Sequence, residues 1–295
     1  MRIAALLAVL GGCASPPPAT PVSRAVDFLV SRQAPDGLWK SDTTTVLGSG
    51  QALTPFVLYA LSHASPETLA PHRKAIDRGL DRLPISGDEY PSYALALSIL
   101  ALHRLRRSAD TGPLDLALRA RQLTEDNGWS ESDPEYGGWD HGTAMPKKPE
   151  CRRPDVSVTA FAVEALGGNA KARRFAERCR APAGGYLFTP SRLWEHQNKA
   201  GPGIGYETAT FDALRILGAS PTSDAGLALP EEWREALFFY RAFVRSKVRP
   251  DPATASAVLA RQNPDGSFRN PVALMKEDDP LIATGLALAA LCLCR

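Results

Sequence analysis

Arg32-Gln33-Ala34-Pro35-Asp36-Gly37-Leu38-Trp39, near the start of the chain, is matched near its end by Arg261-Gln262-Asn263-Pro264-Asp265-Gly266-Ser267-Phe268. Five of these eight residues are identical, and the eighth is aromatic in both copies. Weaker copies lie between them, at Arg121-Gln122 leading to Asn127-Gly128-Trp129 and at residues 181–186. Internal repetition of this kind indicates that one supersecondary unit is copied around the fold.

The composition is that of one large globular domain. The chain has 295 residues, of which 44% are hydrophobic and 22% charged, so it can bury a sizeable core. A net charge of +2 without a sustained basic run argues against a nucleic-acid partner. No apolar stretch approaches the roughly 20 residues that span a bilayer as a helix.

The first residues resemble a bacterial lipoprotein signal. Met1-Arg2 precedes the apolar run 3–10, and Leu10-Gly11-Gly12-Cys13 has the form of a lipobox. We therefore expect a signal peptide over residues 1–12, a lipidated Cys13 with a Pro-rich tether over 13–22, and a folded domain over 23–295. The prediction is an exported lipoprotein anchored to a membrane of the cell envelope, the outer one if the cell has two. The alternative is a cytosolic protein with a chance cysteine.

Helical patterns surround the repeated octapeptides. Each octapeptide follows an amphipathic segment, residues 25–30 and 253–259, and precedes a segment that is apolar nearly all round, such as residues 93–100 and 282–291. A helix that is apolar on every face must be buried on every face. The alternation predicts an all-α fold in which an outer ring of helices packs around an inner ring.

The apolar segments share a second signature, a threonine seven residues before a leucine. Seven residues are about two helical turns, so both side chains lie on one face. The pairs are Thr54 with Leu61, Thr159 with Leu166, Thr210 with Leu217 and Thr284 with Leu291, while Tyr93 with Leu100 takes the same slot in the second unit.

Together these residues carry a family resemblance from about residue 24 to the end. The octapeptide is similar to the QW-type motif of prenyltransferase and squalene-cyclase repeats, which build an α/α toroid. Within that superfamily the chain resembles bacterial repeat proteins without a settled role. The matching residues are Tyr136-Gly137-Gly138-Trp139, Arg153-Pro154-Asp155-Val156-Ser157-Val158-Thr159 and Glu277-Asp278-Asp279-Pro280. The resemblance implies two concentric helical rings built from about six repeats.

One repeat departs from this pattern. Residues 218–230 are too short and too rich in glycine for a full outer helix. We expect the fifth unit to be incomplete, with residues 231–245 serving as the fifth inner helix.

Asp278 and Asp279 are weak candidates for catalysis. The resemblance implies an Asp-x-Asp-Asp acid that protonates an alkene, but Lys276 replaces the first aspartate of such a motif ending at Asp279. Asp279 before Pro280 also suits a helix N-cap, which is the structural interpretation.

Other polar and aromatic residues form a candidate ring site. Asp155 and Glu207 stand near the starts of inner helices, where they would stabilise the helix dipole or share one rim of the ring. Trp39, Trp139 and Phe268 either line a cavity or staple neighbouring helices, with Gln33 or Gln262 bonding a nearby backbone.

The sequence predicts neither a metal site nor a cofactor. Zinc catalysis would need converging Asp, Cys and His ligands, and the close set of Asp140, His141 and Cys151 lacks the family's spacing. The pair Cys151 and Cys179 is either a disulfide or two buried thiols.

These observations favour a non-catalytic, membrane-anchored repeat protein that binds a protein, peptide or lipid through the ring. The alternative is an isoprenoid or terpene (squalene) cyclase-like enzyme, which an enclosed aromatic cavity with a buried Asp278 or Asp279 would favour.

Overall fold

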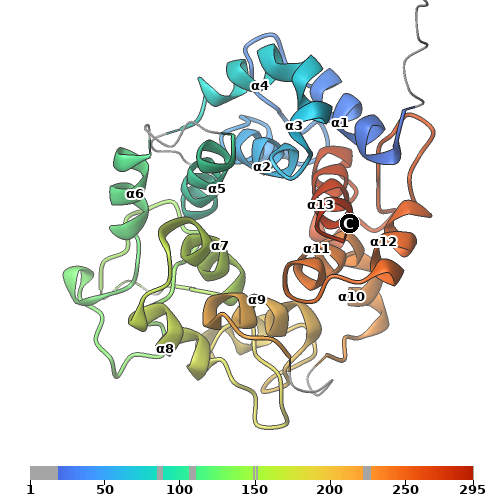
Figure 1. Cartoon of the computed structure of the whole chain (residues 1–295). Coiled ribbons are helices and arrows are strands. Elements are labelled where there is room, and N and C mark those ends of the chain that lie inside the picture. Colours follow the sequence, from blue (N-terminus) through green and yellow to red (C-terminus); the bar gives the residue numbers. More distant parts are fainter. Residues whose placement is uncertain are drawn as a thin grey trace, which may run out of the picture.

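The computed structural model describes residues 19–84, 89–105, 111–148, 150, 152–221 and 227–294, and this part of the chain is helical without strands. Figure 1 shows the helices in two concentric rings. The inner ring consists of α2 (Leu53–Leu61), α5 (Pro91–Arg104), α7 (Val156–Leu166), α9 (Glu207–Leu217), α11 (Phe238–Val248) and α13 (Pro280–Leu293). Each packs against the next, and α13 returns to α2, so the inner ring is closed.

The outer ring is less complete. It contains α1 (Pro21–Ser31), α3 (Pro66–Leu69), α4 (Arg73–Leu80), α6 (Gly112–Arg119), α8 (Ala170–Arg178) and α12 (Pro252–Leu259). Between α9 and α11, the described residues contain only the short α10 (Glu231–Ala236). The all-α toroid is therefore confirmed, and the fifth repeat lacks an outer helix within the described residues.

The expected single helix over residues 231–245 is wrong in one respect. It is divided into α10 and α11 at Leu237, whose φ of −112° and ψ of 23° are not helical. The physical reason is the carboxylate of Glu277, which accepts hydrogen bonds from the backbone N–H groups of Phe239 and Tyr240 at 2.9 and 2.8 Å. These N–H groups belong to the first turn of a helix, where they need such an acceptor.

The repeated octapeptide joins an outer helix to the inner helix that follows it. In four repeats, the backbone N–H of the motif aromatic residue donates to the hydroxyl of an inner-helix threonine. The pairs are Trp39 to Thr54 (2.9 Å), Trp139 to Thr159 (3.1 Å), Tyr186 to Thr210 (3.0 Å) and Phe268 to Thr284 (2.9 Å). The four threonines found in the sequence thus fasten the two rings together.

The motif side chains complete this junction. The indole N–H of Trp39 donates to the carbonyl oxygen of Leu29 at the end of α1, 2.6 Å away. The Gln33 amide donates to the carbonyl oxygens of Gly37 within the motif and Ala75 in α4, at 2.9 and 2.8 Å. Gln33 therefore stabilises the turn of its own motif and links that motif to α4. From the sequence, this glutamine was expected to bond a nearby backbone.

The copy of the motif that begins at Arg121-Gln122 differs from the sequence interpretation. Trp139, rather than Trp129, occupies the aromatic position, because the Gln122 amide donates to the carbonyl of Gly137 at 2.9 Å. Trp129 instead packs in a small separate cluster with Leu123 and Tyr136. The intervening loop is an insertion inside the motif, which sequence spacing alone could not place.

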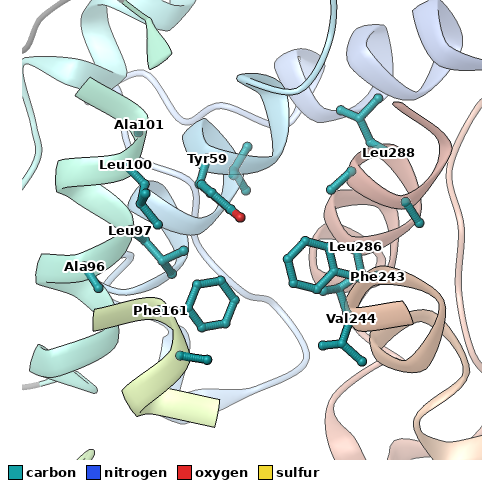
Figure 2. Close-up of a cluster of buried hydrophobic side chains, with 14 of the residues drawn as sticks. Tyr59, Ala96, Leu97, Leu100, Ala101, Phe161, Phe243, Val244, Leu286 and Leu288 are labelled. Atoms are coloured by element: carbon teal, nitrogen blue, oxygen red, sulfur yellow. The ribbon is translucent and has the colours of Figure 1, made fainter. Parts of the chain in front are cut away.

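Aromatic side chains fill the middle of the ring. Figure 2 shows Tyr59, Phe161 and Phe243 reaching inward from α2, α7 and α11. The Phe161 and Phe243 rings stack with centroids 6.0 Å apart, and Tyr59 meets both edge-on. Such contacts add to the free energy that burial of these rings contributes.

We predict that Gly266→Val lowers the free energy of unfolding more than Gly37→Val, and that both lower it. The φ angles are +88° and +87°, which β-branched residues rarely adopt, at a cost of about 1–3 kcal/mol. A Cβ at Gly266 would also lie 2.3 Å from the carbonyl oxygen of Arg24, against 3.1 Å from that of Arg78 at Gly37. Denaturant unfolding measures both values.

Gly112→Val is the matched control, because a Cβ there meets no atom within 4 Å. A wild-type unfolding midpoint for Gly266→Val would contradict the structural role of the motif turn.

Candidate functional site

A cavity of about 400 Å³ lies at one end of the inner ring. Residues from the first two turns of all six inner helices line it, together with the loops that enter those helices. The amino-terminal ends of the six helices therefore converge on the cavity. Its apolar wall consists of Leu47, Leu53, Phe56, Leu97, Phe161, Phe188, Leu237, Met275, Ile282 and Leu286.

A layer of aromatic and charged side chains crosses the ring behind the cavity and separates it from a second hollow of about 470 Å³ at the carboxyl-terminal ends of α7, α9 and α11. Beyond the Phe161–Phe243 stack, Glu164 accepts hydrogen bonds from Arg215 at 2.9 Å and from Lys247 at 2.5 Å. Burial would raise the pKa of Glu164, but these two cations hold it at about 2. Because this aromatic and ionic layer lies behind the cavity, the cavity does not pass through the ring.

Four polar residues from four inner helices form a chain of hydrogen bonds in the cavity wall. The Tyr93 hydroxyl donates to Ser157 Oγ at 2.8 Å, and Ser157 Oγ contacts the Tyr240 hydroxyl. The Tyr240 hydroxyl donates to Asp212 Oδ2, and Arg215 donates to Asp212 Oδ1, both at 2.7 Å. Burial raises the pKa of Asp212 to about 6, against the opposing effects of Arg215 and Tyr240.

The two other cavity acids are also engaged by the protein. Asp155 is the N-cap of α7, where Oδ1 accepts from the Val158 N–H at 2.9 Å, and Oδ2 lies 3.3 Å from His141 Nδ1. Glu277 accepts the two N–H groups of α11 and one from the Asn270 amide at 3.1 Å. Burial raises the pKa of Glu277 to about 7, although all three donors act in the opposite direction.

The cavity cations have different partners. Lys199 Nζ lies 4.4 Å from the centroid of the Phe188 ring and 3.4 Å from the Tyr206 hydroxyl. Burial lowers the pKa of Lys199 to about 8, although Asp155 and Asp212 favour its charged form from a longer distance.

Two more cations stand against rings in the same wall. The Arg153 guanidinium lies over Trp194 at 5.5 Å, and Lys276 lies over Tyr90 at 5.8 Å. Arg153 also contacts His141 Nε2, and within the described part of the chain none of these three cations forms an ion pair with a carboxylate.

The candidate residues that the sequence analysis selected lie in different parts of the structure. Asp155 lines the cavity, but Glu207 is buried beside it in an ion pair with Arg241 at 2.6 Å. Trp39, Trp139 and Phe268 lie between the rings, each at most 1% exposed, and none lines the cavity.

The two candidate catalytic acids, Asp278 and Asp279, do not line the cavity either. Asp279 has the N-cap geometry expected before Pro280, since Oδ1 accepts from the Leu281 N–H at 2.8 Å. Its Oδ2 accepts from Ser41 and Thr43. Asp278 is half-buried outside the cavity.

Two sequence predictions concern residues for which the structure gives little. Cys13 and Cys151 lie outside the described residues, and Cys179 is fully buried. Among the residues described, no group of three or more His, Cys, Asp or Glu side chains is arranged to hold a metal ion, and no helix is long and apolar enough to cross a membrane.

Sequence reasoning missed Asp212, Tyr240 and Lys199. Asp212 carried a usable signal, because a buried acid needs a charged or hydrogen-bonding partner, and Arg215 follows it by three residues on the same helix. Lys199 gave no such signal, because it belongs to an irregular loop whose path only the fold determines.

Comparison with known proteins identifies the fold. No family model and no curated protein matches the chain. Among solved structures, a variant of the type II terpene cyclase MstE from Scytonema, in complex with its substrate geranylgeranyl dihydroxybenzoate, aligns with a TM-score of 0.54 at 11% identity, covering 93% of this chain and 96% of that one. A second variant in complex with the same substrate aligns at 12% identity, covering 92% and 95%, with a TM-score of 0.43. At these identities the likeness shows a terpenoid cyclase-like α/α toroid and nothing finer.

Proposed function

We propose that this toroid binds one small amphiphilic molecule in its central cavity, without transforming it, by enclosing an apolar body and pairing an anionic head group. The observation that carries the proposal is the unequal pairing of charges in the cavity wall. Carboxylate oxygens of all three acids accept hydrogen bonds from the protein. None of the three cations has a carboxylate partner within the described residues: Lys199 and Lys276 lie against aromatic rings, and Arg153 contacts Trp194 and His141.

The apolar wall suits the body of such a ligand. A volume of about 400 Å³ lies within the range of small-molecule pockets, roughly 300–1,000 Å³, and mostly apolar walls with a few placed polar groups are typical of them. Because the Phe161–Phe243 stack and the ion pairs of Glu164 lie behind the cavity, the ligand would enter from the end where the loops lie.

The head group would meet Lys199 and Arg153. Each lies against an aromatic ring that supports its positive charge but leaves N–H donors for a ligand. The six inner-helix amino termini also favour negative charge at this end of the ring. A carboxylate or a phosphate satisfies both requirements.

We predict that Lys199→Met weakens binding of 11-(dansylamino)undecanoic acid about 10-fold or more and leaves binding of its methyl ester nearly unchanged. A hydrogen bond to a charged group contributes about 1.5–3 kcal/mol, and 1.4 kcal/mol is a factor of ten in affinity. Fluorescence titration measures both affinities, and Lys148→Met is the control for loss of an exposed lysine.

The charge of Lys199 sets the direction in which the affinity for the acid changes with pH. The affinity of the wild type for the acid should fall as the pH rises through about 8, because Lys199 then loses its proton. Lys199→Arg should remove this fall, since an arginine stays charged. Equal affinities of wild type and Lys199→Met for the acid would contradict the proposal.

A second candidate function is terpene cyclase-like catalysis, which Asp212 favours as a buried acid in the wall of the cavity. Against it, Arg215 and Tyr240 both donate to this carboxylate and so stabilise its charged form, whereas a proton donor must be neutral. We predict no cyclised product when the protein is incubated with squalene or prenyl diphosphates. A product that disappears in Asp212→Asn would establish the enzyme.

We further propose that the protein is an exported lipoprotein held at a membrane by Cys13. The support is the Leu10-Gly11-Gly12-Cys13 sequence and the Pro-rich segment after it. Stable anchoring needs more than one acyl chain. Mass spectrometry of the native amino terminus should find a multiply acylated Cys13, and an intact Met1 or an unmodified cysteine would refute the proposal.

A further inference from the structure

Exposed apolar side chains gather at the end of the ring where the cavity lies. Seven large hydrophobic residues of the described chain are exposed, and five belong to loops that enter inner helices. These five, which we call the apolar rim, are Val46, Met145, Leu193, Ile204 and Leu274, with exposed fractions of 46, 54, 68, 49 and 55%. The other two, Leu116 and Leu259, lie on outer helices.

The apolar rim is contiguous with the cavity wall. Val46 and Leu274 are direct neighbours in the chain of Leu47 and Met275, which line the cavity. Leu193 precedes Trp194, whose ring lies 5.5 Å from the Arg153 guanidinium in the wall. The rim residues come from loops before α2, α7, α9 and α13, so they are distributed around the cavity instead of forming one groove.

Basic residues accompany the rim. Lys147 follows Met145 by two positions, Arg192 precedes Leu193, and Lys276 follows Leu274 by two positions. Exposed apolar side chains with cations near three of them are typical of segments that bind at the boundary between the head groups and the acyl chains of a bilayer. Trp194, which is half-buried among them, is a residue type enriched at that boundary.

We infer that the apolar rim docks on the surface of a lipid bilayer, so that the cavity opens toward the membrane. The inference extends the proposed function, because the bilayer would then supply the amphiphile, but the contact with lipid does not depend on which molecule the cavity holds.

The predicted lipid anchor is compatible with this orientation. The end of α1 meets the start of α2 through Trp39, so the start of α1 lies at the opposite end of the ring from the rim. The 11 residues of α1 rise about 16 Å at 1.5 Å per residue. Residues 14–20 span at most about 25 Å at roughly 3.5 Å per residue. This reach exceeds the length of α1, so the tether does not confine Cys13 to the end of the ring where α1 starts.

Quenching of Trp194 by brominated lipid tests the inference. Full-length protein is mixed with vesicles of brominated phosphatidylcholine, with and without phosphatidylglycerol, and tryptophan fluorescence is recorded. We expect quenching in the wild type, more of it with the anionic lipid, and loss of the quenched component in Trp194→Phe. The double variant Leu193→Glu/Leu274→Glu should lose most of the quenching, and the matched variant Leu116→Glu/Leu259→Glu should retain it.

Equal quenching in the two double variants, or none in the wild type, would overturn the inference. Binding of the dansyl acid methyl ester in vesicle-free solution separates the two proposals. An unchanged affinity in the rim variant shows that the cavity is intact, so that the lost quenching reports docking. Quenching that depends on the rim in a protein that does not bind the ester would refute the cavity function and support docking.

Discussion

The toroid depends on one repeated hydrogen bond, from the backbone N–H of a motif aromatic residue to a threonine hydroxyl in the first turns of an inner helix. The bond forms in four repeats between fully or nearly fully buried groups. A buried N–H without an acceptor would cost about 1–3 kcal/mol, so the threonine determines where the chain crosses from the outer ring to the inner one. Because every crossing is made at the same end of a helix, the inner helices run in one direction and their amino termini meet at one cavity.

This shared direction gives the two ends of the ring different chemistry. At the amino-terminal end, the positive ends of the helix dipoles and lysine and arginine side chains surround an apolar cavity. At the carboxyl-terminal end, Arg215 and Lys247 converge on Glu164 beneath a stack of aromatic rings. Cations near helix carboxyl termini are favourable, and here they also neutralise a buried acid. The carboxyl-terminal half of the ring therefore holds ionic and aromatic interactions that stabilise the fold, whereas the cavity at the amino-terminal end is the proposed ligand site.

Two acids of the last repeat, Glu277 and Asp279, form hydrogen bonds that hold helix starts in place. Glu277 belongs to the segment that resembles a cyclase acid motif, yet its carboxylate satisfies the first N–H groups of α11. Asp279 holds the start of α13 and the loop that contains Ser41, which ties the last repeat to the first. These acids stabilise the closed ring, and the likeness to MstE is a likeness of architecture.

The sequence could predict the features that depend on interactions between residues close together in the chain. The repeated octapeptide, the apolar helices and the spaced threonines depend on contacts within one repeat, so they predicted the all-α toroid, its ring order and the incomplete fifth unit. The site depends on contacts between repeats. Tyr93, Ser157, Tyr240 and Asp212 come from four inner helices and meet only because the ring closes. Lys199 and the apolar rim lie in loops without periodicity, and only the tertiary structure places them around one cavity. Local hydrogen bonding and periodicity can be read along a chain, whereas the convergence of distant helix ends is a property of the closed ring.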